Sequence, residues 1–149
     1  MKTKLVILFF SIFLFTNCLP DDNNDITNQE TTVIQWHLVN VSGGISGDNH
    51  SFEIDDVIWI FDEFNSRLII QNNNDDDVLE DGLNSGNYDY FFINDNDDNL
   101  FLVIDIDEYG LITFSQDGEI LTIDRTNQST GNVADEYIYE FDKQTIVIN

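Results

Sequence analysis

Few side chains in this sequence could carry out acid-base or nucleophilic chemistry. The two histidines, His37 and His50, are the only side chains whose unperturbed pKa lies near neutrality. His50 shares a stretch of four residues with Asp48 and Ser51, the residue types of a catalytic triad. In a triad the nucleophile and its base converge from separate elements, so this polar stretch indicates a surface loop. His37 follows Trp36 in an apolar segment and should have a packed or surface role, and we expect no catalytic residues and no enzymatic activity.

Runs of acidic residues could bind calcium, which prefers carboxylate and carbonyl oxygens. The segment 95–99 has acidic or amide side chains at alternate positions, as a calcium-binding loop does. Such a loop needs Gly at its sixth position and Glu at its twelfth, where this chain has Leu100 and Ile106. The second acidic run, 75–81, has no recognisable order of ligands. We therefore predict no specific metal site and no cofactor.

Aromatic side chains are the remaining candidates for a binding site. They could line the interior of a β-barrel and accept a small hydrophobic ligand. Alternatively they simply fill that interior, because an eight-stranded barrel is only just wide enough for side chains. A connected void on the order of several hundred Å³ distinguishes the first case from the second. The candidate ligand-binding residues are Trp36, Trp59, Phe61, Tyr88, Tyr90 and Phe92.

The acidic composition restricts the partners of the protein. The chain has 29 Asp and Glu residues against 5 Lys and Arg, a formal net charge of -24 at pH 7. Because phosphate binding draws on clustered Lys and Arg, we expect no nucleic-acid partner. A basic protein is compatible with this charge, and the alternative function is therefore an inhibitor-like or assembly module with a filled barrel and acidic loops that contact such a partner.

The N-terminus has the three-part plan of a secretory signal peptide. Lys2 and Lys4 precede an apolar segment of 11 residues, 5–15, and a short polar segment then leads to Cys18, the only cysteine. The apolar segment is shorter than the roughly 20 residues that a transmembrane helix needs. This order predicts an exported protein with a signal peptide at residues 1–17.

The position of Cys18 resembles that of the lipidated cysteine in bacterial lipoprotein signals, which becomes the new N-terminus. The resemblance implies attachment to a membrane through acyl chains on Cys18. Residues 18–31 are too polar to bury a core and are predicted to be a flexible acidic tether. Its residues Asp21, Asp22 and Asp25 also resemble the acidic export signal of some Bacteroidota lipoproteins, with an ordinary acidic linker as the alternative. The implied location is the cell envelope, as an outer-membrane lipoprotein that is periplasmic or surface-exposed.

The remaining residues, 32–149, are predicted to form one all-β domain. The domain has a single Ala, while the chain has 12 Phe and 5 Tyr with many Ile and Val, residues that favour strands over helices. We predict strands at 33–41, 56–64, 67–71, 88–94, 100–107, 111–115, 120–125 and 136–141, with 145–148 as a candidate ninth. Short connections at 65–66, 108–110 and 116–119 favour antiparallel neighbours. The longer stretches 42–55 and 72–86 are predicted to be mobile loops.

Most of these strands have one apolar face. A closed sheet turns that face inward and also removes the exposed edges that invite aggregation. The predicted fold is therefore a small up-and-down antiparallel β-barrel of about eight strands.

Four segments resemble the lipocalin-like domains of Bacteroidota lipoproteins. They are QWHLV at 35–39 with the Gly pair at 43–44, IWIF at 58–61, LNSGNYDY at 83–90 and GEILTIDR at 118–125. The resemblance implies a barrel closed near its first strand, with an open mouth for an apolar ligand at the other end. It also implies a basic residue from the last strand over Trp36, for which Lys143 is the candidate. The chain departs from the family pattern at Ile34, where the family has Gly, and at Lys143, where it has Arg.

Overall fold

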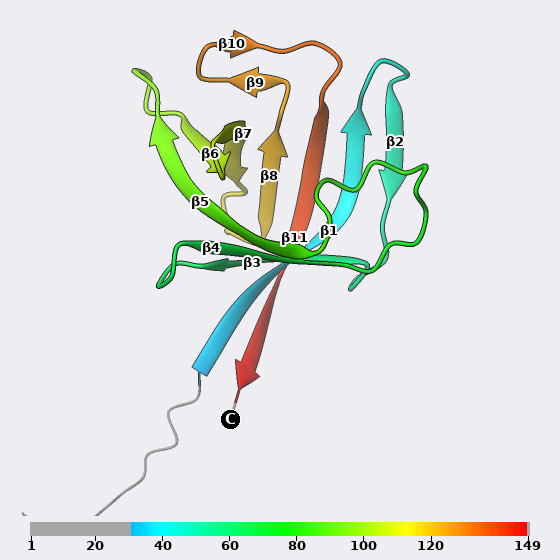
Figure 1. Cartoon of the computed structure of the whole chain (residues 1–149), viewed down its shortest axis with the longest axis vertical. Helices are drawn as coiled ribbons and strands as arrows, with labels where there is room; N and C mark the ends of the chain where they lie inside the picture. The colour runs from blue at the N-terminus through cyan, green and yellow to red at the C-terminus, as the bar shows by residue number, and fades with distance from the viewer. Residues whose placement is uncertain (1–30, 149) are drawn as a thin grey trace, which may run out of the picture.

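The computed structural model describes residues 31–148, and every regular element among them is a strand (Figure 1). The predicted signal peptide, Cys18 and nearly all of the predicted tether lie outside the described residues. The strands are β1 (Thr31–Gly43), β2 (Asp48–Ser51), β3 (Val57–Asp62), β4 (Arg67–Asn72), β5 (Gly86–Asn94), β6 (Leu100–Ile104), β7 (Asp107–Phe114), β8 (Ile120–Asp124), β9 (Asn127–Gln128), β10 (Gly131–Asn132) and β11 (Tyr137–Ile148). Between Thr31 and Ile148 no helix has the length and hydrophobicity that crossing a membrane would require.

Eight strands form a closed antiparallel barrel. Sequence neighbours lie side by side in the order β1, β3, β4, β5, β6, β7, β8, β11, and pairing of β11 with β1 closes the ring. β2 adds to the edge of β1 outside this ring, and β9 with β10 forms a separate two-stranded ribbon (Figure 1). The prediction of an all-β, up-and-down antiparallel barrel of about eight strands is confirmed.

Alternation along the strands places one apolar set in the barrel interior. Residues opposite each other in an antiparallel pair share a face, and Trp59 lies opposite both Trp36 and Ile70. Trp59 is fully buried and Trp36 is 8% exposed, so both indoles belong to the core. The interior cluster continues through Tyr90 on β5 and Phe141 on β11.

The turn predicted at 108–110 is wrong, because these residues lie inside β7. The chain reverses instead at Asp105 and Ile106, where Asp105 takes a φ of 55°, a conformation that Asp tolerates better than most residues. Gly110 is required for close approach, since a Cβ there would lie 2.6 Å from the carbonyl oxygen of Asp124 on β8. A bulge at this place leaves Tyr109 without a partner on β6 and turns its side chain into the core.

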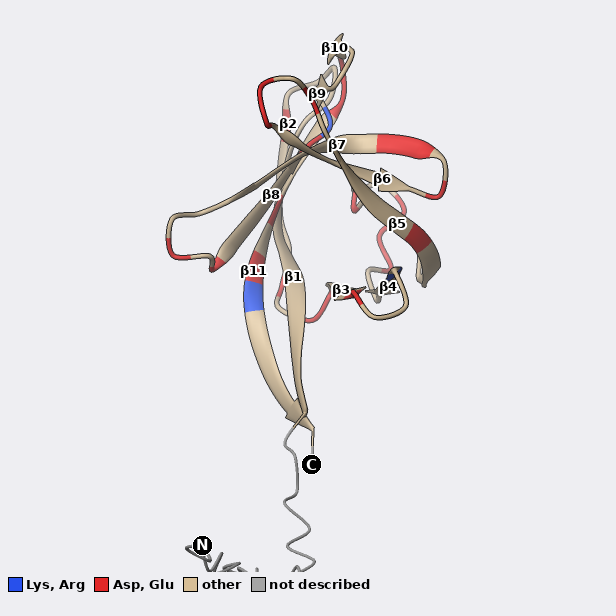
Figure 2. Ribbon diagram, turned by 90° about the vertical axis from the view of Figure 1, so that its left-hand side faces the viewer, with Lys and Arg blue, Asp and Glu red and all other residues tan. Residues whose placement is uncertain are grey.

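Two other predicted segments also differ from the structure. The stretch 42–55, predicted as a loop, contains β2, whose polar residues pair with the end of β1. The last two predicted strands are one continuous strand, β11, because its polar centre keeps its pairing with β1. Beyond the barrel, the first residues of β1 and the last residues of β11 extend as a two-stranded ribbon, 31–35 with 144–148, that has no acidic residue (Figure 2).

Candidate functional site

A pocket of about 280 Å³ opens at the end of the barrel where β1 begins. Three tight turns border this end, those between β3 and β4, between β5 and β6, and between β7 and β8. The lining residues come from the adjoining ends of these strands and from β1. They are Ile34, Trp36, Phe61, Glu63, Tyr90, Phe92, Leu100, Ile112, Phe114 and Leu121.

Aromatic rings make up half of this lining and contact one another in two groups. On one side Tyr90 lies edge-on to Phe61 and Phe92, with ring centroids 5.1 and 5.5 Å apart. On the other side Trp36 and Phe114 have centroids 5.7 Å apart. These are distances at which aromatic pairs stabilise each other.

The depth of the pocket follows from the exposure of its rings. Trp36 and Tyr90 are buried, whereas Phe92 is 42% and Phe114 53% exposed. The buried rings therefore form the inner wall and the exposed rings form the mouth. Apolar side chains half-exposed around a concavity are the usual setting of a small-molecule site.

Glu63 is the one charged residue in the pocket wall. It belongs to the turn after β3 and is exposed. Burial raises the pKa of the Tyr90 hydroxyl, and the nearby carboxylates of Glu63 and Asp62 raise it further. The mouth of the pocket is thus a region of negative potential.

Within residues 31–148 no basic side chain forms an ion pair with Glu63. The three Lys and Arg residues of this part of the chain each bind another carboxylate. Arg67 Nη1 lies 2.8 Å from Asp89, Arg125 Nη2 lies 3.1 Å from Glu136, and Lys143 Nζ lies 3.3 Å from Glu119. The carboxylate of Glu63 is therefore not neutralised by any Lys or Arg between Thr31 and Ile148.

The structure brings together four of the six predicted ligand-binding residues. Trp36, Phe61, Tyr90 and Phe92 line the pocket. Trp59 does not, because it is packed deeper in the barrel, with its ring centroid 5.0 Å from that of Phe141. Tyr88 is also outside the lining: it is half-buried and donates its hydroxyl hydrogen bond to the carbonyl oxygen of Asn84 at 2.9 Å.

Sequence reasoning missed six lining residues. Ile112, Phe114 and Leu121 share one barrel face through the pairing of β7 with β8, and alternation within the predicted strands 111–115 and 120–125 was a usable signal for them. Ile34 shares the face of Trp36 in the predicted strand 33–41, and Leu100 begins the predicted strand 100–107, so alternation was a usable signal for these two as well. Glu63 follows β3 in a turn, and strand periodicity carries no information about it.

The opposite end of the barrel is closed by the segment 79–83. Tyr139, fully buried on β11, donates a hydrogen bond to Oε1 of Glu80 at 2.7 Å. Leu83 packs against the core, and Gly82 passes so close to Tyr109 and Trp59 that an added Cβ would lie 3.3 Å from the Tyr109 hydroxyl. The expectation of a mobile loop at 72–86 is thus wrong for this part of the segment, which packs as a plug.

Two buried tyrosine hydroxyls, those of Tyr109 and Tyr139, also lie at the closed end of the barrel. Burial raises the pKa of the Tyr109 hydroxyl to about 12 and raises that of Tyr139 further. The Tyr109 hydroxyl and the Trp59 indole nitrogen have no hydrogen-bond partner among the described residues. Arg125 lies over the Tyr109 ring, 4.7 Å from its centroid.

Two expectations from the family resemblance are therefore wrong. The open end lies near the start of β1, and the plug 79–83 closes the end that was expected to be open. Lys143 does lie opposite Trp36 in the strand register, but its ammonium group donates a hydrogen bond to Glu119. Among residues 31–148 the cation-π contact is instead that of Arg125 with Tyr109.

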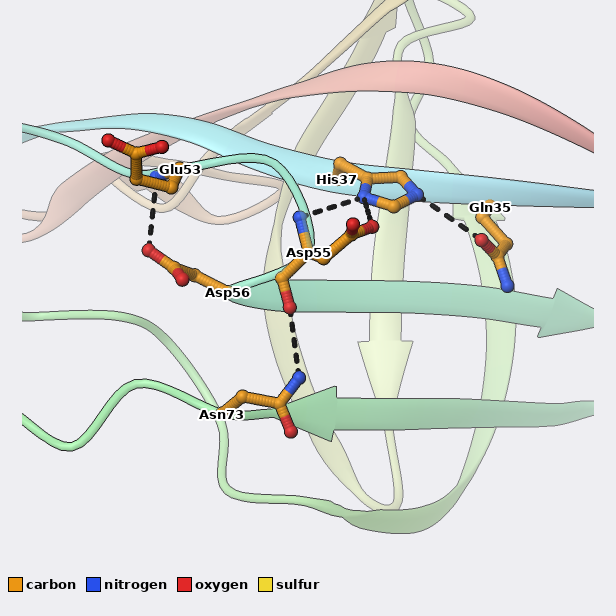
Figure 3. Close-up of polar contacts among 6 residues, drawn as sticks. All are labelled: Gln35, His37, Glu53, Asp55, Asp56 and Asn73. Atoms are coloured by element: carbon orange, nitrogen blue, oxygen red, sulfur yellow. Dashed lines mark hydrogen bonds and ion pairs between the residues drawn. The ribbon is translucent and has the colours of Figure 1, made fainter.

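His37 lies on the outer surface of the barrel wall, yet it is only 2% exposed (Figure 3). Its Nδ1 accepts a hydrogen bond from the backbone N–H of Asp55 at 3.2 Å, and its Nε2 is 3.3 Å from Oε1 of Gln35. Its Nδ1 also lies 3.2 Å from Oδ1 of Asp55, so this nitrogen contacts both the backbone and the side chain of that residue. Asn73 in turn donates to the carbonyl oxygen of Asp55 at 2.9 Å. The ring thus binds the 52–56 turn to β1. His37 therefore has a packed role, one of the two roles that the sequence predicts for it.

The other candidates for chemistry are engaged in local structure. His50 and Ser51 are consecutive residues of β2, and their side chains therefore point to opposite faces of the sheet. Asp95 Oδ1 accepts hydrogen bonds from the backbone N–H groups of Asp97 and Asn99, at 2.9 and 3.0 Å. A hydrogen bond from the Asn99 side chain, followed by these two backbone bonds, lowers the pKa of Asp95. Its carboxylate caps the β5–β6 turn.

Comparisons with known proteins give no assignment for this site: no family model, curated protein or solved structure matches the chain. The geometry alone therefore defines what the site can do. It offers an apolar, aromatic concavity with one carboxylate at its edge. Such a concavity can bind and orient an apolar group.

Proposed function

We propose that this protein is a lipid-anchored lipoprotein of the cell envelope whose lipocalin-like barrel binds a small hydrophobic molecule and does not transform it. The observation that carries the proposal is the 280 Å³ pocket with its aromatic and aliphatic lining. Burial of apolar ligand surface at about 25 cal/mol per Å² would supply the affinity. The volume is near the lower end of the usual range for ligand sites, about 300 to 1,000 Å³, and thus favours a small ligand or one short chain.

The division of the barrel into two halves favours a ligand over a filled barrel. Trp59, Tyr139 and Phe141 fill the half beside the plug and leave it tightly packed. The other half is hollow although large aromatic residues surround it. The alternative, a protein-binding module with a filled barrel, accounts for the first half only.

Binding without catalysis is favoured by the side chains in the pocket wall. Its ionisable groups are the Glu63 carboxylate and the Tyr90 hydroxyl, whose pKa is raised. A nucleophile activated by an adjacent base, the arrangement that covalent catalysis needs, is not formed by these two groups. Both histidines lie outside the lining.

The envelope location is supported by the sequence before the barrel. Cys18 follows the predicted signal peptide, and Thr31, where β1 begins, is 13 positions after it. A chain of this length can reach at most about 45 Å. Acyl chains on Cys18 would therefore hold the barrel close to the membrane surface.

Filling the pocket should abolish binding of a neutral apolar probe. Leu100→Trp places an indole in the pocket wall, and Ile106→Trp adds the same indole at a 90% exposed position away from it. We expect the mature chain and Ile106→Trp to bind N-phenyl-1-naphthylamine at one saturable site, and Leu100→Trp to lose at least tenfold in affinity. Fluorescence titration gives the dissociation constants, and equal binding by the two variants would contradict the proposed site.

A further inference from the structure

We propose that the pocket selects ligands with a positively charged head, specifically an alkylammonium group on a short apolar chain. The inference rests on the proposed function, since it assigns a ligand class to the same pocket. Three features support it: the aromatic rings of the pocket, the carboxylate of Glu63 without an ion pair, and the further acidic residues in the turns around the opening.

The aromatic rings suit a cation because their faces are electrostatically negative. Trp36, Phe61, Tyr90, Phe92 and Phe114 surround the cavity from four different strands. Rings on several sides of one space are the arrangement by which proteins bind methylated ammonium groups, through cation-π attraction within about 6 Å. A purely aliphatic wall would bury a hydrocarbon equally well but would not attract the charge.

Glu63 supplies the opposite charge at the mouth. Its carboxylate lies in the pocket wall and has no ion pair with the described basic residues. Its field reaches the inner wall, where it contributes to the raised pKa of Tyr90. A ligand ammonium near Glu63 would take the place of the missing counter-ion.

The turns that border the opening extend this negative potential. The β3–β4 segment contains Asp62 and Glu63, the β5–β6 turn contains acidic residues at 95, 97 and 98, and the β7–β8 turn contains Asp117 and Glu119. Figure 2 shows acidic residues on hairpin turns while the protruding ends of β1 and β11 have none. Two basic residues lie at this end, Lys143 opposite Trp36 and Arg67 opposite Asp62 in the strand register, and they form ion pairs with Glu119 and Asp89 respectively. A carboxylate or phosphate head would meet repulsion at this mouth.

Three probes built on eight-carbon chains separate the effect of ligand charge from that of ligand hydrophobicity. Octyltrimethylammonium, octanoate and 1-octanol are titrated into the mature chain by calorimetry at low salt. We expect the cation to bind at least tenfold more tightly than octanoate and more tightly than octanol. Its advantage should shrink as salt is added, because exposed charges are screened.

Matched variants locate the effect. Glu63→Gln should weaken binding of the cation about fivefold, the size expected for one charge pair near 4 Å in water, and leave octanol unchanged. Glu140→Gln makes the same charge change at an exposed position on β11 outside the pocket and should leave both unchanged. Phe92→Leu, which keeps the site apolar, should weaken the cation more than octanol.

The outcomes distinguish this inference from the proposed function. If octanol or octanoate binds as tightly as the cation, the charge selection is wrong while apolar binding stands. If Glu63→Gln and Glu140→Gln act equally, the effect belongs to the net charge and the inference is overturned. If none of the three probes binds at a saturable site, the proposed function fails as well.

Discussion

Replacing Trp59 by Ala is expected to lower the free energy of unfolding by about 3 to 5 kcal/mol, as for large aromatic residues removed from cores. The indole is fully buried, and its ring centroid lies 5.0 Å from that of Phe141 and 5.7 Å from that of Tyr109. Its nitrogen has no hydrogen bond among the described residues, so the loss is one of packing. The same ring lies beneath Gly82 of the plug, together with Tyr109 and Tyr139. Denaturant unfolding followed by circular dichroism measures the change.

Two further variants test whether burial is the cause. Phe64→Ala removes a ring that is 95% exposed and should leave the unfolding midpoint unchanged. Trp36→Ala should cost less than Trp59→Ala, because one side of Trp36 already faces the pocket. An unchanged midpoint for Trp59→Ala would show that the inward face of β3 has been misassigned.

Replacing Cys18 by Ser is expected to move the protein from the membrane fraction to the soluble fraction. The thiol is the proposed acylation site, and the chain has no second cysteine that could replace it. The folded body would not hold to an anionic surface, because removal of residues 1–17 leaves three Lys and Arg residues against 29 Asp and Glu, a formal charge of about -26. Fractionation of the native cells followed by immunoblotting measures the distribution.

Mass spectrometry separates lipid anchoring from an uncleaved signal peptide. Wild-type protein should begin at residue 18 and carry the added mass of acyl chains, and Thr16→Ser, which keeps the thiol, should behave identically. Retention of a correctly cleaved Cys18→Ser variant in the membrane fraction would show that the anchor lies elsewhere.

Much of the barrel could be predicted because its signals are local. The alternation of Tyr88, Tyr90 and Phe92 with Asn87, Asp89 and Phe91 indicates a strand and favours the face of the first three as the inward one. The Asp117-Gly118 pair marks the β7–β8 turn, where Gly118 takes a φ of 74°. Neither signal depends on any distant part of the chain.

The missed features depend on contacts between distant residues. β2 is short and polar, and it exists only because the end of β1 offers an edge. The bulge at Tyr109 follows from the close approach of Gly110 to Asp124. The plug depends on a hydrogen bond between Glu80 and Tyr139, which are 59 residues apart. Propensity and periodicity contain no information on such pairs.

The orientation of the pocket has a comparable explanation. Alternation identified which aromatic rings face inward but not which end of the barrel is open. The connection 73–85 lies at one end of the barrel and is long enough to include the plug, whereas the turns 63–66, 95–99 and 115–119 at the other end are too short to cover it. The opening near the start of β1 therefore results from loop length together with the seating of 79–83.

The most direct test of the pocket uses the two tryptophans as separate reporters. Trp36 lines the pocket and Trp59 does not, so Trp59→Phe leaves a reporter in the wall and Trp36→Phe leaves one in the packed core. Titration with 8-bromo-1-octanol, whose bromine quenches indole fluorescence on contact, should quench Trp36 in a saturable manner and leave Trp59 nearly unchanged. Equal quenching of the two reporters, or no saturable quenching of Trp36, would contradict a ligand site at this end of the barrel.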